Sequence, residues 1–240
     1  MGNHRTSDVA ASPREPVARA AHTPLRWVAL PLFALAVLLA NLPFDLGPSL
    51  LRNGQPGAGS SAVGPIYWAT HIGYGVLLGV LWVIADRVLR GRLRPLGWAL
   101  ALGLGALLFS PDGVVYFANA FAFGADLALQ GLRALWPMAV GSAFLGYWLG
   151  WAAVHARVRT AALVLTGLIV GVAGHILCGA LTPISILDRF SGPVPMFGFV
   201  ATGLPRAGLE GALLGLAVGL ALRQVSGLEA RPTDNLGGIS

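Results

Sequence analysis

The chain has 240 residues, of which 55% are apolar and 11% charged, and its mean hydropathy is +0.71. Soluble domains carry about 25% charged residues, so this composition excludes an ordinary soluble fold and favours one membrane domain with short tails. The formal net charge is +6, and all 16 basic residues are arginine. The absence of lysine excludes Schiff-base chemistry, a lysine general base and a Walker-type phosphate site. Cys178 is the only cysteine, which excludes an intrachain disulfide and a four-cysteine metal site.

Six apolar stretches, taken in chain order, predict transmembrane helices. Each has, within a few residues, the roughly 20 residues of helix that cross about 30 Å of hydrocarbon, and lipid leaves a spanning chain little choice but helix. The predicted spans are Trp27 to Leu42, Pro65 to Ala85, Pro95 to Ser110, Ala134 to Val154, Ala161 to Leu181 and Pro205 to Leu222. The predicted organisation is a disordered cytoplasmic tail over 1–26, a membrane helical bundle over 27–222 and a second disordered cytoplasmic tail over 223–240. The expected fold class is an all-α integral membrane protein, a bundle of six transmembrane helices with both termini inside.

Arginine placement supports this orientation. With the N-terminus inside, 12 arginines fall on the cytoplasmic side, and only Arg52, Arg133, Arg189 and Arg206 fall outside, as the positive-inside rule requires. The basic residues flank the spans, so the expected partner is the lipid bilayer with its anionic headgroups, and no nucleic acid is expected. The exclusive use of arginine hints at a GC-rich genome, and hence at a multi-pass protein of a bacterial plasma membrane, the cell inner membrane.

The segment 113–131 has two interpretations. It is apolar enough for a seventh span, but it carries Asn119, Asp126 and Gln130. A seventh span would reverse everything after it and change the arginine split to 11 against 5. We favour six spans, in which case this segment is an interfacial or re-entrant piece that follows a turn at Ser110-Pro111-Asp112-Gly113.

Glycine pairs recur in the second, fourth and sixth predicted spans. The pairs are Gly75-x-x-x-Gly79, Gly146-x-x-x-Gly150 and the longer Gly211-x-x-x-Gly215-x-x-x-Gly219, each followed by arginine. Small residues four apart let helix backbones approach closely in lipid. The chain therefore reads as three helical hairpins, and the glycine-rich faces are expected to serve helix packing within the bundle or contact with a partner subunit or a second copy.

Polar side chains in the spans gather at one depth. His71 and His175 each lie about six residues from the outer ends of their spans, Glu210 lies about five residues in, and Asn41 lies near the outer end of the first span. At 1.5 Å per residue the three ionisable groups lie roughly 5 to 10 Å below the outer surface. Ionisable groups at such depth face one another or water rather than lipid. We therefore expect an outward-facing polar pocket.

The loops on the outer side add to this pocket. The segment Phe44 to Gly64 is rich in glycine, proline and serine and is expected to form a flexible lid. Asp188 stands in the loop Thr182 to Leu204, and Asp126 lies on the same side. The predicted pocket residues are His71, His175, Glu210, Asn41, Asp126 and Asp188.

The same residues also allow metal binding or acid–base chemistry. His71, His175 and Glu210 have the ligand types of a two-histidine, one-carboxylate site, but they come from three helices without a local spacing motif. No cofactor is predicted, and a divalent metal at these three residues is the alternative. The plain explanation of Glu210 is an ion pair with Arg206, four residues earlier on the same helix. No catalytic residue is assigned, because no hydrolase elbow, histidine box or aspartate-rich prenyl-diphosphate motif is present.

Three functions remain open at this point. The favoured one is a small solute-binding or transport component, since the layout is similar to that of the substrate-binding subunits of energy-coupling-factor vitamin transporters, which also have six helices and bind from outside. The first alternative is an integral membrane enzyme that acts on a lipid or isoprenoid-like substrate by acid/base chemistry, with Glu210 and a histidine exchanging protons. The second is an accessory or assembly subunit of a membrane complex.

Overall fold

The computed structural model describes residues 27–51, 65–89, 91–155, 159–182 and 195–229, and these residues form helices without any strand. A 3-10 turn, η3 (Gly91–Leu93), precedes α3. The α-helices, in chain order, are α1 (Ala29–Leu51), α2 (Pro65–Val88), α3 (Arg94–Phe109), α4 (Pro111–Phe123), α5 (Ala125–His155), α6 (Thr160–Leu181) and α8 (Pro195–Glu229).

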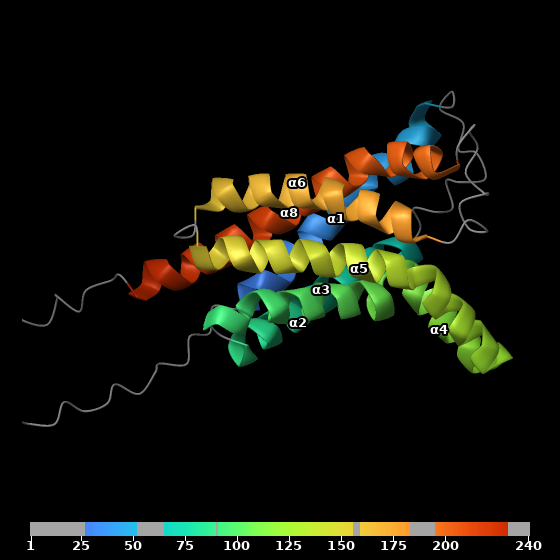
Figure 1. The fold of residues 1–240 in the computed structure, drawn as a ribbon, viewed down its shortest axis with the longest axis horizontal. Helices are drawn as coiled ribbons and strands as arrows, with labels where there is room; N and C mark the ends of the chain where they lie inside the picture. Colours follow the sequence, from blue (N-terminus) through green and yellow to red (C-terminus); the bar gives the residue numbers. More distant parts are fainter. Residues whose placement is uncertain (1–26, 52–64, 90, 156–158, 183–194, 230–240) are drawn as a thin grey trace, which may run out of the picture.

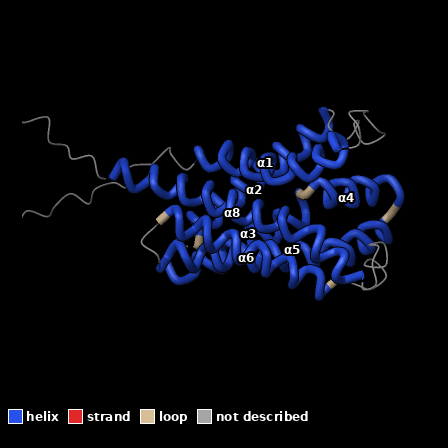
Figure 2. Tube along the Cα trace, turned by 90° about the horizontal axis from the view of Figure 1, so that it is seen from above, coloured by secondary structure: helices blue, strands red, loops and turns tan. Residues whose placement is uncertain are grey.

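Six of these helices close into a ring. Going round it, α1 packs on α2, α2 on α3, α3 on α5, α5 on α6, α6 on α8, and α8 returns to α1. The helices run along one common direction, as Figures 1 and 2 show from two sides. We call the end where α1 begins and α8 finishes the terminal end, and the opposite end, from which α4 projects, the α4 end; these lie at the left and right of Figure 1.

Glycine stripes hold the two helices of each hairpin together. A Cβ on Gly75 of α2 would come within 2.5 Å of the Ala34 Cα of α1, and a Cβ on Gly150 of α5 would come within 2.7 Å of the Pro95 Cα of α3. Gly211 of α8 meets the Gly167 carbonyl of α6 in the same way. Each glycine pair that the sequence singles out thus faces the preceding helix of its own hairpin. Predicted contact with a partner subunit or a second copy stays a prediction, and it would have to use other faces.

Apolar side chains fill the ring and also cover its outside. Phe33, Trp82 and Trp98, from three successive helices, pack with ring centroids 5.6 and 5.2 Å apart in the buried core. Leu165 and Ile169 of α6 are 57% and 58% exposed. A helix that is apolar on all sides is expected where the surrounding solvent is lipid.

Several helices are longer than the sequence predicts. α1 continues to Leu51, so the first part of the predicted lid is helical, and α8 begins at Pro195, so the second part of the loop Thr182 to Leu204 is helical too. Pro205 was expected to start the last span, but it lies inside α8. Proline is tolerated there because neighbouring groups in a membrane bundle can satisfy the freed backbone. α8 also runs seven residues past Leu222, into the predicted C-terminal tail, while the predicted N-terminal tail lies outside the described residues.

The segment 113–131 is divided between two helices. Ser110 is the N-cap of α4: its Oγ accepts a hydrogen bond from the Gly113 amide at 3.1 Å, and Pro111 takes the first helical position. The predicted turn at this point is therefore a helix cap. Gly124, with a φ of 106°, interrupts the helix between α4 and α5. α4 with its 13 residues is about 20 Å long, too short to cross hydrocarbon by itself, and with the first turns of α5 it forms a hairpin that projects from the bundle (Figure 1).

Candidate functional site

A polar contact joins the first and last helices of the ring. Arg206 of α8 donates through its Nη2 to the Oδ1 of Asn41 on α1, across 165 positions of sequence. Asn41 is 5% exposed, and its amide nitrogen donates to the Val37 carbonyl at 2.6 Å. Both ends of the Asn41 amide are therefore engaged, which fixes the direction in which its oxygen points.

Glu210 lies one turn further along α8 and is half-buried. It interacts electrostatically with Arg206 and with Tyr74 of α2. The i, i+4 spacing on one helix places Glu210 beside Arg206, as the sequence indicates. Tyr74, which is 9% exposed, extends the cluster to α2, and pattern reasoning missed it because a tyrosine in an apolar span looks like a packing residue. We call Asn41, Tyr74, Arg206 and Glu210 the junction cluster.

His175 of α6 packs directly on α8. Its imidazole lies against Gly203, so closely that a Cβ there would overlap the ring. Gly203 precedes Arg206 by three residues, or about 5 Å along the helix axis. His175 therefore lies within one helical turn of the junction cluster, and Gly203 is the residue that makes room for it.

His71 of α2 is buried, with 7% of its surface exposed. Its Nδ1 lies 3.0 Å from the Tyr67 carbonyl, and its ring packs on the Tyr67 ring with centroids 4.1 Å apart. Because a carbonyl can only accept, Nδ1 is the donor, and Nε2 is the acceptor when the ring is neutral. His71 precedes Tyr74 by three residues on the same face of α2.

The remaining predicted pocket residues are placed differently. Asp126 is exposed in the first turn of α5, within the hairpin that projects from the α4 end. Asp188 lies outside the described residues. Across the described ranges, no three His, Cys, Asp or Glu side chains are grouped so that they could hold a metal ion, and the alternative metal site at His71, His175 and Glu210 stays a prediction.

A second buried polar cluster lies near the terminal end, between α2 and α3. Asp86 is 1% exposed, its Oδ1 lies 2.9 Å from Arg94 Nε, and it accepts a hydrogen bond from Trp98 Nε1 at 3.3 Å. The sequence analysis did not single out Asp86. The spacing Asp86…Arg94, across the tight turn that contains Gly91 (φ 62°), was the available signal.

The two polar clusters lie between hairpins rather than within them. Contacts are most extensive inside the hairpins α6–α8 and α3–α5, and less extensive where α1 meets α8 and α2 meets α3. The third junction, α5 with α6, is closed by backbone approach of Gly141 and Gly174. The junction of α1 with α8 is thus one of the less tightly packed junctions of the ring, and the hydrogen bond from Arg206 to Asn41 crosses it beside apolar core residues of both helices.

The fold defines the class of protein. Four helices, Tyr67–Val88, Gly91–Phe109, Thr160–Leu181 and Gly203–Arg223, are long and apolar enough to cross a membrane, and Ala29–Phe44 is a shorter apolar helix. The chain is a multi-pass, membrane-embedded helical protein. No family model, curated protein or solved structure matches it.

Proposed function

We propose that this chain is a six-span protein of a bacterial plasma (inner) membrane, with both termini in the cytoplasm, and that it serves as a small solute-binding or transport component. The spans would be α1, α2, α3, α5, α6 and α8, and the hairpin of α4 and early α5 would lie at the outer surface. The ring of six helices and the arginine distribution along the chain support this arrangement.

The observation that carries the proposal is the guanidinium of Arg206 within the helix ring. A cation at this depth requires an anionic or polar partner; Asn41 accepts a hydrogen bond from Arg206, and Glu210 lies one helical turn away on the same helix. A solute with a carboxylate or similar anionic group would take over these interactions with Arg206. His175, Tyr74 and His71 lie on the neighbouring helices and would contribute hydrogen bonds to the rest of the solute.

The location of Arg206 supports entry from the α4 end. A hydrogen bond from Arg206 to Asn41 joins α8 to α1, and a solute that replaces it would not have to break a glycine stripe. The Asn41 oxygen would lose its donor in this exchange, so the solute must also carry a donor group that reaches Asn41.

The test starts with mass spectrometry of small molecules that co-purify with the full chain in mild detergent. The solute identified is then added back, and thermal stabilisation is measured for wild type, Arg206→Gln, Glu210→Gln and the control Asp112→Asn, which removes an exposed carboxylate from α4. We expect stabilisation of wild type and of the control, and none for Arg206→Gln. Equal stabilisation of all four proteins would refute the proposed site. Turnover of a lipid-like substrate by the purified chain alone would refute the solute-binding role and favour a membrane enzyme.

The orientation has a separate test. In a Cys178→Ala background, single cysteines at Gln130 and Arg92 mark the α4 end and the terminal end, and both positions are exposed. An impermeant maleimide added to intact cells is expected to label the cysteine at 130 and not the one at 92. The opposite pattern would place the junction cluster in the cytoplasmic half.

A further inference from the structure

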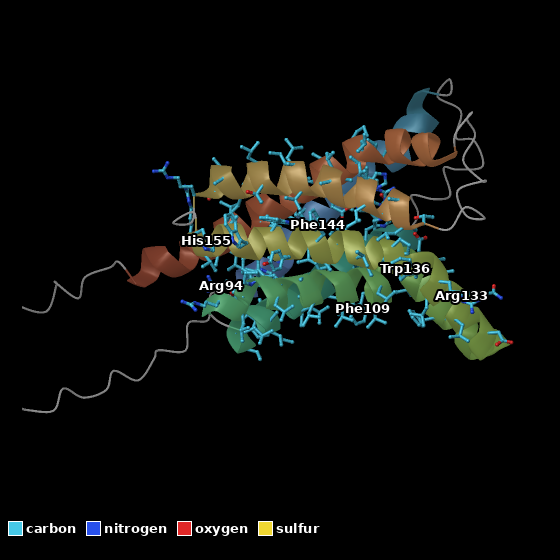
Figure 3. All side chains as sticks on the ribbon, viewed as in Figure 1. Arg94, Phe109, Arg133, Trp136, Phe144 and His155 are labelled. Atoms are coloured by element: carbon cyan, nitrogen blue, oxygen red, sulfur yellow. The ribbon has the colours of Figure 1, made fainter. Side chains whose placement is uncertain are left out.

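A groove lies on the outside of the ring near the terminal end, away from the junction cluster. It has a volume of about 300 Å³ and is formed between the start of α3 and the last turns of α5. Arg92 of η3 and Leu96 of α3 form one wall, and Tyr147, Trp151, Val154 and His155 of α5 form the other. Figure 3 shows His155 and Arg94 close to this end of the bundle.

The α5 wall is held in place by ring contacts. His155 stacks on Trp151 with centroids 4.3 Å apart and an interplanar angle of 23°, and Trp151 packs edge-on against Trp148 at 5.6 Å. Tyr147 packs on Trp148 at 5.8 Å in turn. The aromatic rings that line the groove are therefore preorganised, so binding a ligand would not cost the entropy of ordering them.

The apolar part of the groove is open to the surroundings of the ring. Leu96 is 50% exposed, and Val154 and Trp151 are 41% and 42% exposed. In a membrane-embedded chain such surfaces contact acyl chains, and tryptophan and tyrosine mark the level of the headgroups. The groove therefore spans the boundary between hydrocarbon and headgroups.

The polar part of the groove is basic. Arg92 is exposed, and within the part of the chain that the structure describes its guanidinium has no ion-pair partner. No carboxylate lines the groove among the residues whose positions the structure describes, and Asp86 is paired with Arg94. His155 donates from Nδ1 to the Trp151 carbonyl, 2.8 Å away, so that Nε2 of the neutral ring is an acceptor. The groove thus offers a cation for a phosphate and an acceptor for a hydroxyl.

We propose that this groove binds one anionic glycerophospholipid with a hydroxyl-bearing headgroup, of the phosphatidylglycerol type. Its phosphodiester pairs with Arg92, a headgroup hydroxyl donates to Nε2 of His155, and an acyl chain lies along Leu96 and Val154. The lipid would fix η3 and the end of α5 at the membrane surface. This binding is independent of the solute proposed for the junction cluster.

The test uses native mass spectrometry of the full chain in mild detergent, titrated with dioleoylphosphatidylglycerol or with dioleoylphosphatidylcholine. The matched pair of variants is Arg92→Gln and Arg87→Gln, because both remove one exposed arginine from the terminal end, but Arg87 lies over the Trp27 ring and outside the groove. We expect one retained phosphatidylglycerol on wild type and on Arg87→Gln. Arg92→Gln is expected to bind about tenfold more weakly, the effect of one charge-assisted hydrogen bond.

A second variant and a competitor complete the test. His155→Phe keeps an aromatic ring on Trp151 but removes Nε2. It is therefore expected to weaken the binding of phosphatidylglycerol and to leave the weak binding of phosphatidylcholine unchanged. Excess glycerol 3-phosphate is expected not to displace the lipid, because it lacks the acyl chains. The proposal is overturned if both arginine variants lose lipid equally, if the two lipids bind equally well to wild type, or if glycerol 3-phosphate displaces the lipid.

Discussion

Gly75 of α2 offers a direct measurement of how close the first two helices must come. The substitution Gly75→Ala adds a Cβ 2.5 Å from the Ala34 Cα and 2.8 Å from the Phe33 carbonyl oxygen. Carbon atoms in contact prefer about 3.5–4.0 Å, so α1 would have to move away by roughly 1 Å. Both neighbouring atoms belong to the backbone, which cannot rotate aside as a side chain does. Overpacking of this kind costs about 1–3 kcal/mol.

The matched control is Gly73→Ala in the same helix, where a Cβ meets nothing within 4 Å. Both alanines gain the same helix propensity, about 1 kcal/mol over glycine, so the difference between the variants isolates the steric cost. Unfolding by titration of sodium dodecyl sulfate into mild-detergent micelles, followed by tryptophan fluorescence, gives the free energy of each protein. We expect Gly75→Ala to be less stable than Gly73→Ala by about 1–3 kcal/mol. Equal stability would mean that α1 and α2 do not meet along this stripe.

Three other substitutions test contacts between helices, the first two by the same unfolding assay. Asp86→Asn leaves Arg94 without its carboxylate and is expected to lower the free energy of unfolding by about 2–3 kcal/mol. This is below the range for a fully buried pair, because the Arg94 side chain is 24% exposed; an unchanged free energy would mean that the ion pair does not stabilise the fold. Gly203→Ala is expected to cost about 1–3 kcal/mol by displacing the His175 ring, and the double variant with His175→Ala should recover most of that cost, whereas additive losses would contradict the packing. Arg206→Gln is expected to speed amide hydrogen exchange in the part of α1 around Asn41. Unchanged exchange there would mean that Arg206 does not hold α1 against α8.

The sequence predicted best those features that depend on the residues of one helix alone. Hydropathy located the four helices that are long and apolar enough to cross a membrane and the shorter apolar helix Ala29–Phe44, while the count of six spans stays a prediction. The glycine spacing predicted close packing correctly, and the structure adds that the partner is in each case the preceding helix of the hairpin. Helix ends were predicted less well, since Pro205 and the residues after Leu42 resemble breakers while the surrounding helices α8 and α1 continue through them.

The candidate site was predictable only in part, for a physical reason. Depth placed Asn41, His71, His175 and Glu210 at similar levels, but depth does not say which way a side chain points round a helix. The link from Asn41 to Arg206 crosses 165 positions and depends on the ring closing between α1 and α8. Arg206 looked like a charge of the outer face, because a helix beginning at Pro205 would place it in the first turn.

The distribution of contacts round the ring explains why the junction cluster is the better candidate for function than the cluster at Asp86. Asp86, Arg94 and Trp98 belong to helices joined by one short turn, so their interaction needs little chain organisation and holds two neighbours together. Asn41 and Arg206 belong to the first and last hairpins, which no connection holds side by side. The Asn41–Arg206 contact joins two hairpins that are distant in sequence, whereas the turn at Gly91 keeps α2 and α3 adjacent beside the Asp86 pair. Under the proposed function, a solute that competes for Arg206 would act on the contact between the first and last hairpins.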